Sequence, residues 1–165
     1  MKKLLLLFVA ALLMAACATP EERAARQAEN LRMVKECVGS QKYRINIRSV
    51  TPMRSTSHMV SGRWLIVDGD KVNCYLPYIG REDIPHFKSH AELRQDAKIE
   101  FKGDIENYFL NYLPKKKCGV VTFSSEYGGE KLDFSITIDN TGTAKIHLIP
   151  EKRDYIDYEG TVTAY

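Results

Sequence analysis

Two histidines give this 165-residue chain its clearest metal-binding spacing. His86 and His90 stand four positions apart, which on a helix would bring both imidazoles to one face. Nearby carboxylates could supply a third ligand: Glu82, Asp83 and Glu92. However, Pro85 directly precedes His86, and no glutamate stands between the histidines as a zinc-protease motif requires. We therefore interpret the segment as a solvated loop, and we predict no metal and no cofactor.

Other motifs for catalysis are absent from the sequence. It contains no Gly-x-Ser-x-Gly elbow, no phosphate-binding glycine-rich loop and no Cys-x-x-Cys. A catalytic cysteine would need a neighbouring base that the sequence does not identify. The acidic residues near the C-terminus are equally well explained by an exposed strand. The sequence therefore predicts a non-enzymatic protein, and a hydrolase whose site is assembled from dispersed residues is the least favoured hypothesis.

The N-terminus carries the pattern of an exported and lipidated protein. Two lysines precede an uninterrupted apolar run over 4–16, which is too short to span a bilayer core of ~30 Å. The residues Met14-Ala15-Ala16-Cys17 that follow resemble a bacterial lipobox. The resemblance implies that Cys17 receives a diacylglycerol and becomes the first mature residue, with ordinary secretory cleavage as the alternative. Ala18, in place of Asp after the cysteine, resembles outer-membrane sorting.

Charge and composition restrict the partners. The chain has 44% hydrophobic and 27% charged residues, which is typical of a globular domain. Removal of Lys2 and Lys3 with the signal would lower the net charge from +3 to +1, so no nucleic-acid surface is predicted. The basic run over 115–117 reads as a solvated turn. We expect the protein to contact the membrane through lipid on Cys17, and to bind a small molecule or another envelope protein.

Three further cysteines would lie in an oxidising compartment. Because Cys37, Cys74 and Cys118 are odd in number, at least one thiol stays unpaired. A bond between Cys74 and Cys118 is slightly favoured, because both lie in strand-like stretches that could be neighbours. Free buried thiols are the open alternative.

The mature chain begins with a helix pattern. Thr19, Pro20 and Glu22 form a helix start with a capping box, and the helix is expected to reach about Val38. Its apolar stripe is thin, so only the second half is expected to dock on a core. We therefore divide the chain into a lipoprotein signal peptide (1–16), a lipidated N-terminus with a helical spacer (17–40) and a β domain (41–165).

The rest of the chain has the period-two pattern of strands. Strands are expected from Lys42 onward and over 62–67, 71–76, 98–102, 105–113, 118–125, 132–138, 144–148 and 155–163, with a long excursion over 82–95. A Gly69-Asp70 turn would pair Val67 with Val72 in a central hairpin that is apolar on both faces. The prediction is an all-β fold: an antiparallel β-sandwich or flattened barrel of about eight or nine strands with a short N-terminal helix.

One string of residues resembles a known family. Leu76-Pro77-Tyr78-Ile79-Gly80-Arg81 is similar to the Leu-Pro-Tyr-x-Gly-Arg signature of small bacterial lipoproteins grouped as domain of unknown function 4251. Further segments agree in the same order and extend the resemblance over roughly 42–162: the opening strand with Thr51-Pro52, the hairpin 63–76, Ile99-Glu100-Phe101, and Arg153 with 156–160. The family has no assigned activity, so the resemblance implies location and architecture only.

The same string is the candidate binding loop. Pro77 ends strand pairing, and a positive φ at Gly80 would turn the backbone and present Tyr78 and Arg81 outward. Tyr and Arg are common in contact hot spots, so these two residues are the predicted ligand- or partner-binding residues. The alternative is a packed strand exit, with Tyr78 covering the edge of the core and Arg81 pairing a carboxylate. The predicted function is thus a lipid-anchored envelope binding module, and the alternative is a structural component that docks on another envelope protein through a sheet edge.

Overall fold

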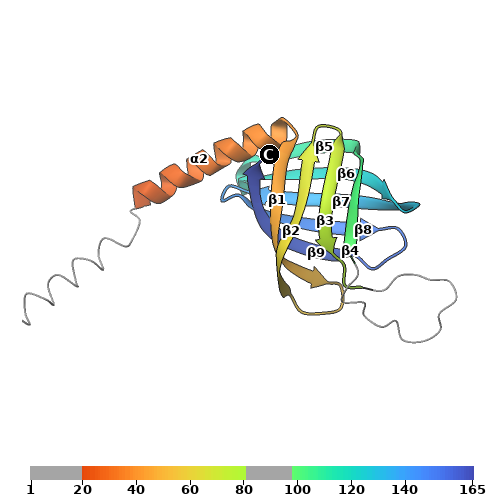
Figure 1. Ribbon diagram of the computed structural model, residues 1–165. Helices are drawn as coiled ribbons and strands as arrows, with labels where there is room; N and C mark the ends of the chain where they lie inside the picture. Colours follow the sequence, from red (N-terminus) through yellow and green to blue (C-terminus); the bar gives the residue numbers. More distant parts are fainter. Residues whose placement is uncertain (1–19, 81–97) are drawn as a thin grey trace, which may run out of the picture.

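The computed structural model describes residues 20–80 and 98–165, which form one helix, nine strands and a short 3-10 turn (Figure 1). Cys17, Arg81, His86 and His90 lie outside the described residues. The elements are α2 (Pro20–Gly39), β1 (Lys42–Pro52), β2 (His58–Asp68), β3 (Lys71–Pro77), β4 (Lys98–Asp104), β5 (Glu106–Leu113), η1 (Pro114–Lys116), β6 (Cys118–Tyr127), β7 (Glu130–Asp139), β8 (Thr143–Pro150) and β9 (Ile156–Ala164). The predicted mostly β chain with a short N-terminal helix is confirmed.

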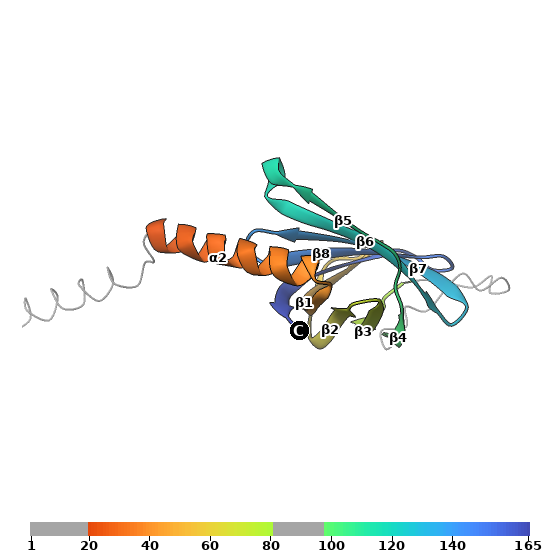
Figure 2. The same ribbon diagram turned by 90° about the horizontal axis from the view of Figure 1, so that it is seen from above.

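All nine strands belong to one antiparallel sheet with the order β4-β3-β2-β1-β9-β8-β7-β6-β5. The sheet curls into a half-barrel, so that β1–β4 cross in front of β6–β8 around a shared interior (Figures 1 and 2). β4 and β5 are consecutive in sequence, with only Ile105 between them, yet they form the two opposite edges. This architecture is the flattened-barrel form of the predicted fold, left open at one side.

The interior is filled by the alternate residues of nearly every strand. In β1, Tyr43, Ile45 and Ile47 are buried, as their period-two spacing predicts. A bulge between Ile47 and Ser49 then shifts the alternation by one residue and brings Val50 inward as well. The same inward alternation in β7 and β8 completes one continuous hydrophobic core.

The predicted Gly69-Asp70 hairpin is present in the predicted register, and β7 and β8 form a second hairpin. Val67 pairs with Val72 and Trp64 with Tyr75 across the turn at Gly69, whose φ is +62°. The outward face of this hairpin is covered by its own long side chains, because the guanidinium carbon of Arg63 lies 4.2 Å from the Tyr75 ring centroid. In the second hairpin, Asp139 accepts hydrogen bonds from the Thr141 and Thr143 backbone N–H groups at 2.8 and 3.0 Å.

The edge strand β4 contacts β6 through side chains, without a hydrogen-bond ladder between the two strands. The rings of Phe101 on β4 and Tyr127 on β6 stack with centroids 5.0 Å apart. Beside them Gly103 approaches β6 so closely that a Cβ atom there would lie 2.7 Å from Ser125 Oγ. We call this contact between β4 and β6 the seam.

α2 docks only through its C-terminal half. Val38 is buried against β1 and β9, whereas residues 20–26 are exposed, which agrees with the thin apolar stripe. The helix ends where Ser40 N–H donates to the Glu36 carbonyl and Gln41 adopts a φ of 55°. Neither described helical segment is long and apolar enough to cross a membrane.

The favoured disulfide prediction is wrong. Cys74 and Cys118 are both free and buried, and Cys37 is free as well. Cys74 lies on β3 and Cys118 on β6, and five strands separate β3 from β6 in the sheet order. Both stretches are strands as expected, but sequence periodicity carries no information about which strands are neighbours.

Candidate functional site

The motif of the predicted binding loop builds a buried cluster at the exit of β3. Tyr78 is 1% exposed, and its hydroxyl donates to the Asp154 carbonyl at 3.0 Å. The guanidinium carbon of Arg153 lies 5.0 Å from the Tyr78 ring centroid. Tyr158 donates in turn to the Pro77 carbonyl at 2.8 Å. These contacts fix the end of β3 to the segment between β8 and β9.

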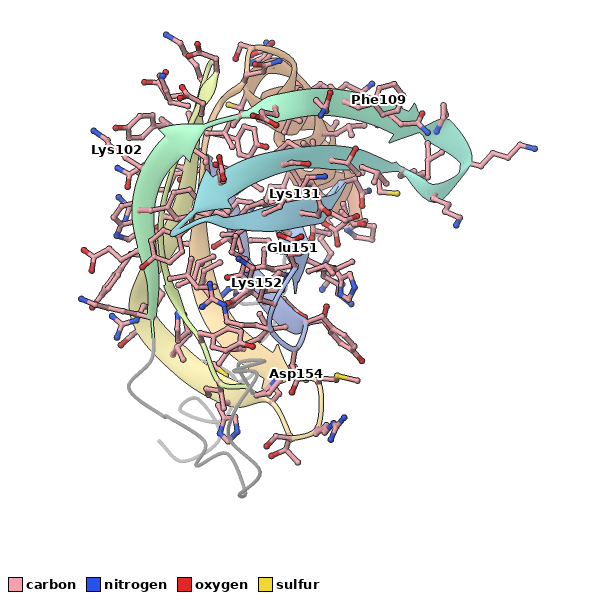
Figure 3. The ribbon with its side chains drawn as sticks, turned by 90° about the vertical axis from the view of Figure 1, so that its right-hand side faces the viewer. Lys102, Phe109, Lys131, Glu151, Lys152 and Asp154 are labelled. Atoms are coloured by element: carbon pink, nitrogen blue, oxygen red, sulfur yellow. The ribbon has the colours of Figure 1, made fainter. Side chains whose placement is uncertain are left out.

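A buried ion pair completes this cluster. Arg153 donates to Glu130 Oε2 through Nε at 2.8 Å and through Nη2 at 2.6 Å, and the two side chains are only 10% and 8% exposed. The other carboxylate oxygen of Glu130 accepts the Lys152 backbone N–H at 2.8 Å. Figure 3 shows the segment concerned, with Glu151, Lys152 and Asp154 in sequence below Lys131. Because both carboxylate oxygens have donors, the burial of this charge is compensated.

The predicted outward orientation of Tyr78 is therefore wrong, and the packed strand exit describes this residue. Gly80 does not take a positive φ either. It is needed for space, because a Cβ atom at this position would lie 2.6 Å from the Tyr78 hydroxyl. Tyr78 turns inward because its ring is apolar and its hydroxyl finds a buried acceptor. We assign Tyr78 a structural role, and Arg81 lies beyond the described residues.

Burial also keeps the thiol of Cys74 and the phenol of Tyr158 protonated. The pKa of Cys74 is raised to about 12 by desolvation, so its thiol stays protonated at neutral pH. Burial raises the pKa of Tyr158 well above its usual range for the same reason. A nucleophilic thiol needs the opposite shift, so Cys74 is a core residue.

One row of polar residues on the outer face has the residue types of a hydrolase. Ser135, His147 and Asp157 are cross-strand neighbours on β7, β8 and β9, and His147 Nδ1 lies 2.6 Å from Asp157 Oδ1. No hydrogen bond joins Ser135 to His147 in the structure, and the backbone groups of these strands are used by the sheet ladder. The row thus lacks the contact between nucleophile and base, and it lacks donors for an oxyanion. Within the described ranges, no group of three or more His, Cys, Asp or Glu side chains is placed to hold a metal ion.

The strongest candidate site is an apolar cleft between α2 and the sheet. It has a volume of ≈ 260 Å³, and it is lined by Leu31, Lys35, Val38, Leu110, Tyr112, Gly119 and Ile138. Figure 2 shows why it forms: the β5–β6 hairpin leaves the body of the sheet and diverges from α2. We call this site the hairpin cleft.

Aromatic packing joins β5, β6 and β7, the three strands that contribute to the hairpin cleft. Tyr108, Phe123 and Phe134 form a stack with centroid separations of 6.2 and 4.7 Å. The Tyr108 hydroxyl donates to the Val38 carbonyl at 3.2 Å and so ties β5 to the end of α2. The cleft is therefore bounded by packed elements and not by loops, as a binding site that keeps its shape requires.

The rim of the hairpin cleft is basic. Lys35 Nζ lies 4.6 Å from the Tyr112 ring centroid. The exposed lysines at 115–117 follow at the tip of the same hairpin. Sequence reasoning missed this site, because its lining residues come from four elements that only the fold brings together. The one local signal was the alternation of Tyr108, Leu110 and Tyr112 in an edge strand.

Comparison with known proteins agrees with the described fold. A family model described as "Domain of unknown function (DUF4251)" matches residues 25–162. The crystal structure of a DUF4251 family protein from Bacteroides eggerthii is similar with a TM-score of 0.65 at 11% identity, over 84% of this chain and 91% of that chain. No curated protein matches. The family match includes most of α2, the strands β1–β8 and all but the last two residues of β9, and on this ground the chain belongs to the DUF4251 family.

Proposed function

We propose that this protein is a lipid-anchored bacterial cell-envelope protein whose β domain binds a small apolar ligand. The observation that supports binding is the hairpin cleft, which is concave, mostly apolar and bounded by regular elements. Small-molecule sites typically combine apolar walls with a few polar groups in this way. No reaction is included in the proposal, because the described residues offer no activated nucleophile.

The anchor part of the proposal rests on the lipobox resemblance at Cys17 and on Ala18 for outer-membrane sorting. It is tested by mass spectrometry of the N-terminal peptide of the exported protein. We expect a diacylglycerol thioether on Cys17, and we expect the Cys17→Ser variant to leave the membrane fraction. An unmodified N-terminus at another residue would identify ordinary secretory cleavage.

The binding part is tested with a variant that fills the hairpin cleft. A Cβ atom at Gly119 would lie 3.7 Å from Leu110 Cδ1, so Gly119→Val adds volume inside the cleft without a clash at Cβ. Valine also suits a strand. We expect protein purified gently from its host envelope to carry an extra mass in native mass spectrometry, and the variant to lose it.

The control for this experiment is Thr122→Val, which places a valine in the same strand but on its outward face. Thr122 pairs with Ser135 and Phe109 and faces away from the core. This variant should keep the extra mass. A wild-type protein with no bound mass would contradict small-molecule binding, as would an extra mass that persists when Gly119 is replaced by valine.

A second candidate function is docking on another envelope protein through the β5 edge. Phe109 is 62% exposed there, and Figure 3 shows Phe109 and Lys102 on the two opposite edges of the sheet. An edge strand offers unpaired backbone groups to an added strand. In pull-downs from intact envelopes, Phe109→Lys should lose a partner that Ile149→Lys, an exposed change on β8, retains.

A further inference from the structure

We propose that the ligand of the hairpin cleft is a fatty acid, whose single hydrocarbon chain lies on the apolar walls and whose carboxylate pairs with Lys35. This inference rests on the proposed function, because it names the ligand class of the same cleft. It is argued from the size, the lining and the charge of the site.

The walls of the hairpin cleft suit a narrow and apolar ligand. Of the seven described residues that line the cleft, only Lys35 and Tyr112 have polar side-chain atoms, so a ligand with many polar groups would be desolvated without compensation. The volume of ≈ 260 Å³ lies below the ~300–1,000 Å³ typical of sites for drug-sized molecules. A single hydrocarbon chain satisfies both conditions, and a bulky ring system does not.

The charge at the rim selects an anion. The ion pairs of the described residues leave Lys35 without a carboxylate partner, since the nearby Glu36 and Glu29 pair with Arg32. Tyr112 holds the Lys35 ammonium at the cleft through its ring face, which leaves N–H donors for a ligand. None of the described residues that line the cleft is acidic. A ligand carboxylate would accept a charge-assisted hydrogen bond from Lys35, which has no such acceptor among the described residues.

Because the positive charge lies at the opening of the cleft, the ligand that matches the site is an amphiphile. Lys35 is exposed, whereas Val38, Gly119 and Ile138 are buried, so the polar end of the site lies at its opening and the apolar end lies inside. The lysines at 115–117 extend the positive surface beyond that opening. A fatty acid matches this order, with its tail inside and its head at the rim.

The test uses the mature chain from residue 17 with Cys17→Ser, so that no acyl chain of its own is present. All residues of the described core lie between Val38 and Val162, so removal of the signal leaves the core complete. Dodecanoate, dodecanol and acetate are the probes, and binding is measured by calorimetry and native mass spectrometry below the micelle concentration. Lys35→Gln removes the charge, and Lys145→Gln is the matched control on the exposed face of β8.

We expect dodecanoate to bind about tenfold more tightly than dodecanol, as one charge-assisted hydrogen bond provides, and acetate not to bind. Lys35→Gln should reduce dodecanoate binding to the level of dodecanol, while Lys145→Gln changes neither. Gly119→Val should abolish the binding of both chains.

Two results overturn the inference, and they are distinguishable. If dodecanoate and dodecanol bind equally and Lys35→Gln changes neither, the fatty-acid inference fails while binding of an apolar ligand in the cleft stands, provided that Gly119→Val removes it. If neither chain binds, or if both still bind the Gly119→Val variant, the hairpin cleft is not the site and the proposed function fails with the inference.

Discussion

Arg153 stabilises the fold mainly because its removal would leave a buried carboxylate without its charged partner. Its partner Glu130 is 8% exposed and would keep a buried carboxylate with a single donor. We therefore expect Arg153→Ala to lower the free energy of unfolding by about 3–5 kcal/mol, the usual cost of breaking a buried pair. Urea denaturation followed by far-ultraviolet circular dichroism measures the change.

The control is Lys71→Ala, which removes an exposed pair with Asp104. Solvent screens that pair, so the denaturation midpoint should not change measurably. Equal effects of the two variants would show that water reaches Glu130 when the arginine is absent, and the cluster at the exit of β3 would then not act as a buried unit.

Tyr78 and Gly80 mark the limit of what could be predicted at the residue scale. The sequence correctly located the end of a strand at Pro77, because proline lacks a ladder donor. It did not predict the direction of the Tyr78 side chain, because the acceptor at Asp154 lies 76 residues away in the chain. Gly80 was expected to provide a positive φ, whereas it provides space for the Tyr78 hydroxyl.

The β6–β7 pair carries a pH-dependent contribution to stability. The Ser124 hydroxyl donates to Asp133 Oδ1 at 2.6 Å, and this bond, with Lys131 nearby, lowers the pKa of Asp133. Because the folded pKa lies below the unfolded value of ~3.9, the stabilisation is complete at neutral pH and is lost as the pH falls through the folded pKa. We expect Ser124→Ala to reduce the loss of stability on acidification, measured as the urea midpoint at neutral pH and at about pH 3.

Asp133→Asn provides the check on this assignment. It removes the titrating group while it keeps an acceptor for the Ser124 hydroxyl, so this variant should also lose part of the acid sensitivity. The effect will be small, because the Asp133 side chain is half exposed. If neither variant changes the acid sensitivity, that sensitivity arises from other carboxylates.

At the scale of elements the sequence was most informative. The alternation in β1, β7 and β8 and the turn at Gly69 are local patterns, and each gave the observed strand or register. The bulge in β1 was not predicted, because an extra residue is recognised only against its partner strands. The second half of α2 docks as its apolar stripe indicated.

The seam between β4 and β6 should be the weak point of the whole molecule. The edge strand β4 meets β6 there through side chains and not through a hydrogen-bond ladder, with Phe101 stacked on Tyr127. We expect Phe101→Ala to speed amide hydrogen exchange in β4 and to leave the central strands β1 and β9 protected. Exchange read by mass spectrometry tests this, and a uniform increase over all strands would show instead that the seam and the core open as one unit.

The arrangement of the whole molecule was the least predictable. Strand periodicity gave an all-β chain, but the strand order, the curl of the sheet and the separation of Cys74 from Cys118 depend on non-local pairing. The hairpin cleft depends on it most, because residues as distant as Leu31 and Ile138 form its walls. Such a site leaves no motif in the sequence.

β1 and β9, the first and the last strand, lie side by side in the middle of the sheet. The strands β1–β4 and β5–β8 form two successive meanders, and in the hydrogen-bond ladder only β9 joins them. A chain that crosses a membrane with its N-terminus first, as we propose for this one, would therefore hold two incomplete half-sheets until its last segment emerges. The pairing of β1 with β9 joins the two ends of the domain, and such non-local pairings slow folding, which would help to keep a chain threadable through an export channel. The same topology makes truncation hazardous, because a chain that stops before β9 would expose two long strand edges and would be prone to aggregate.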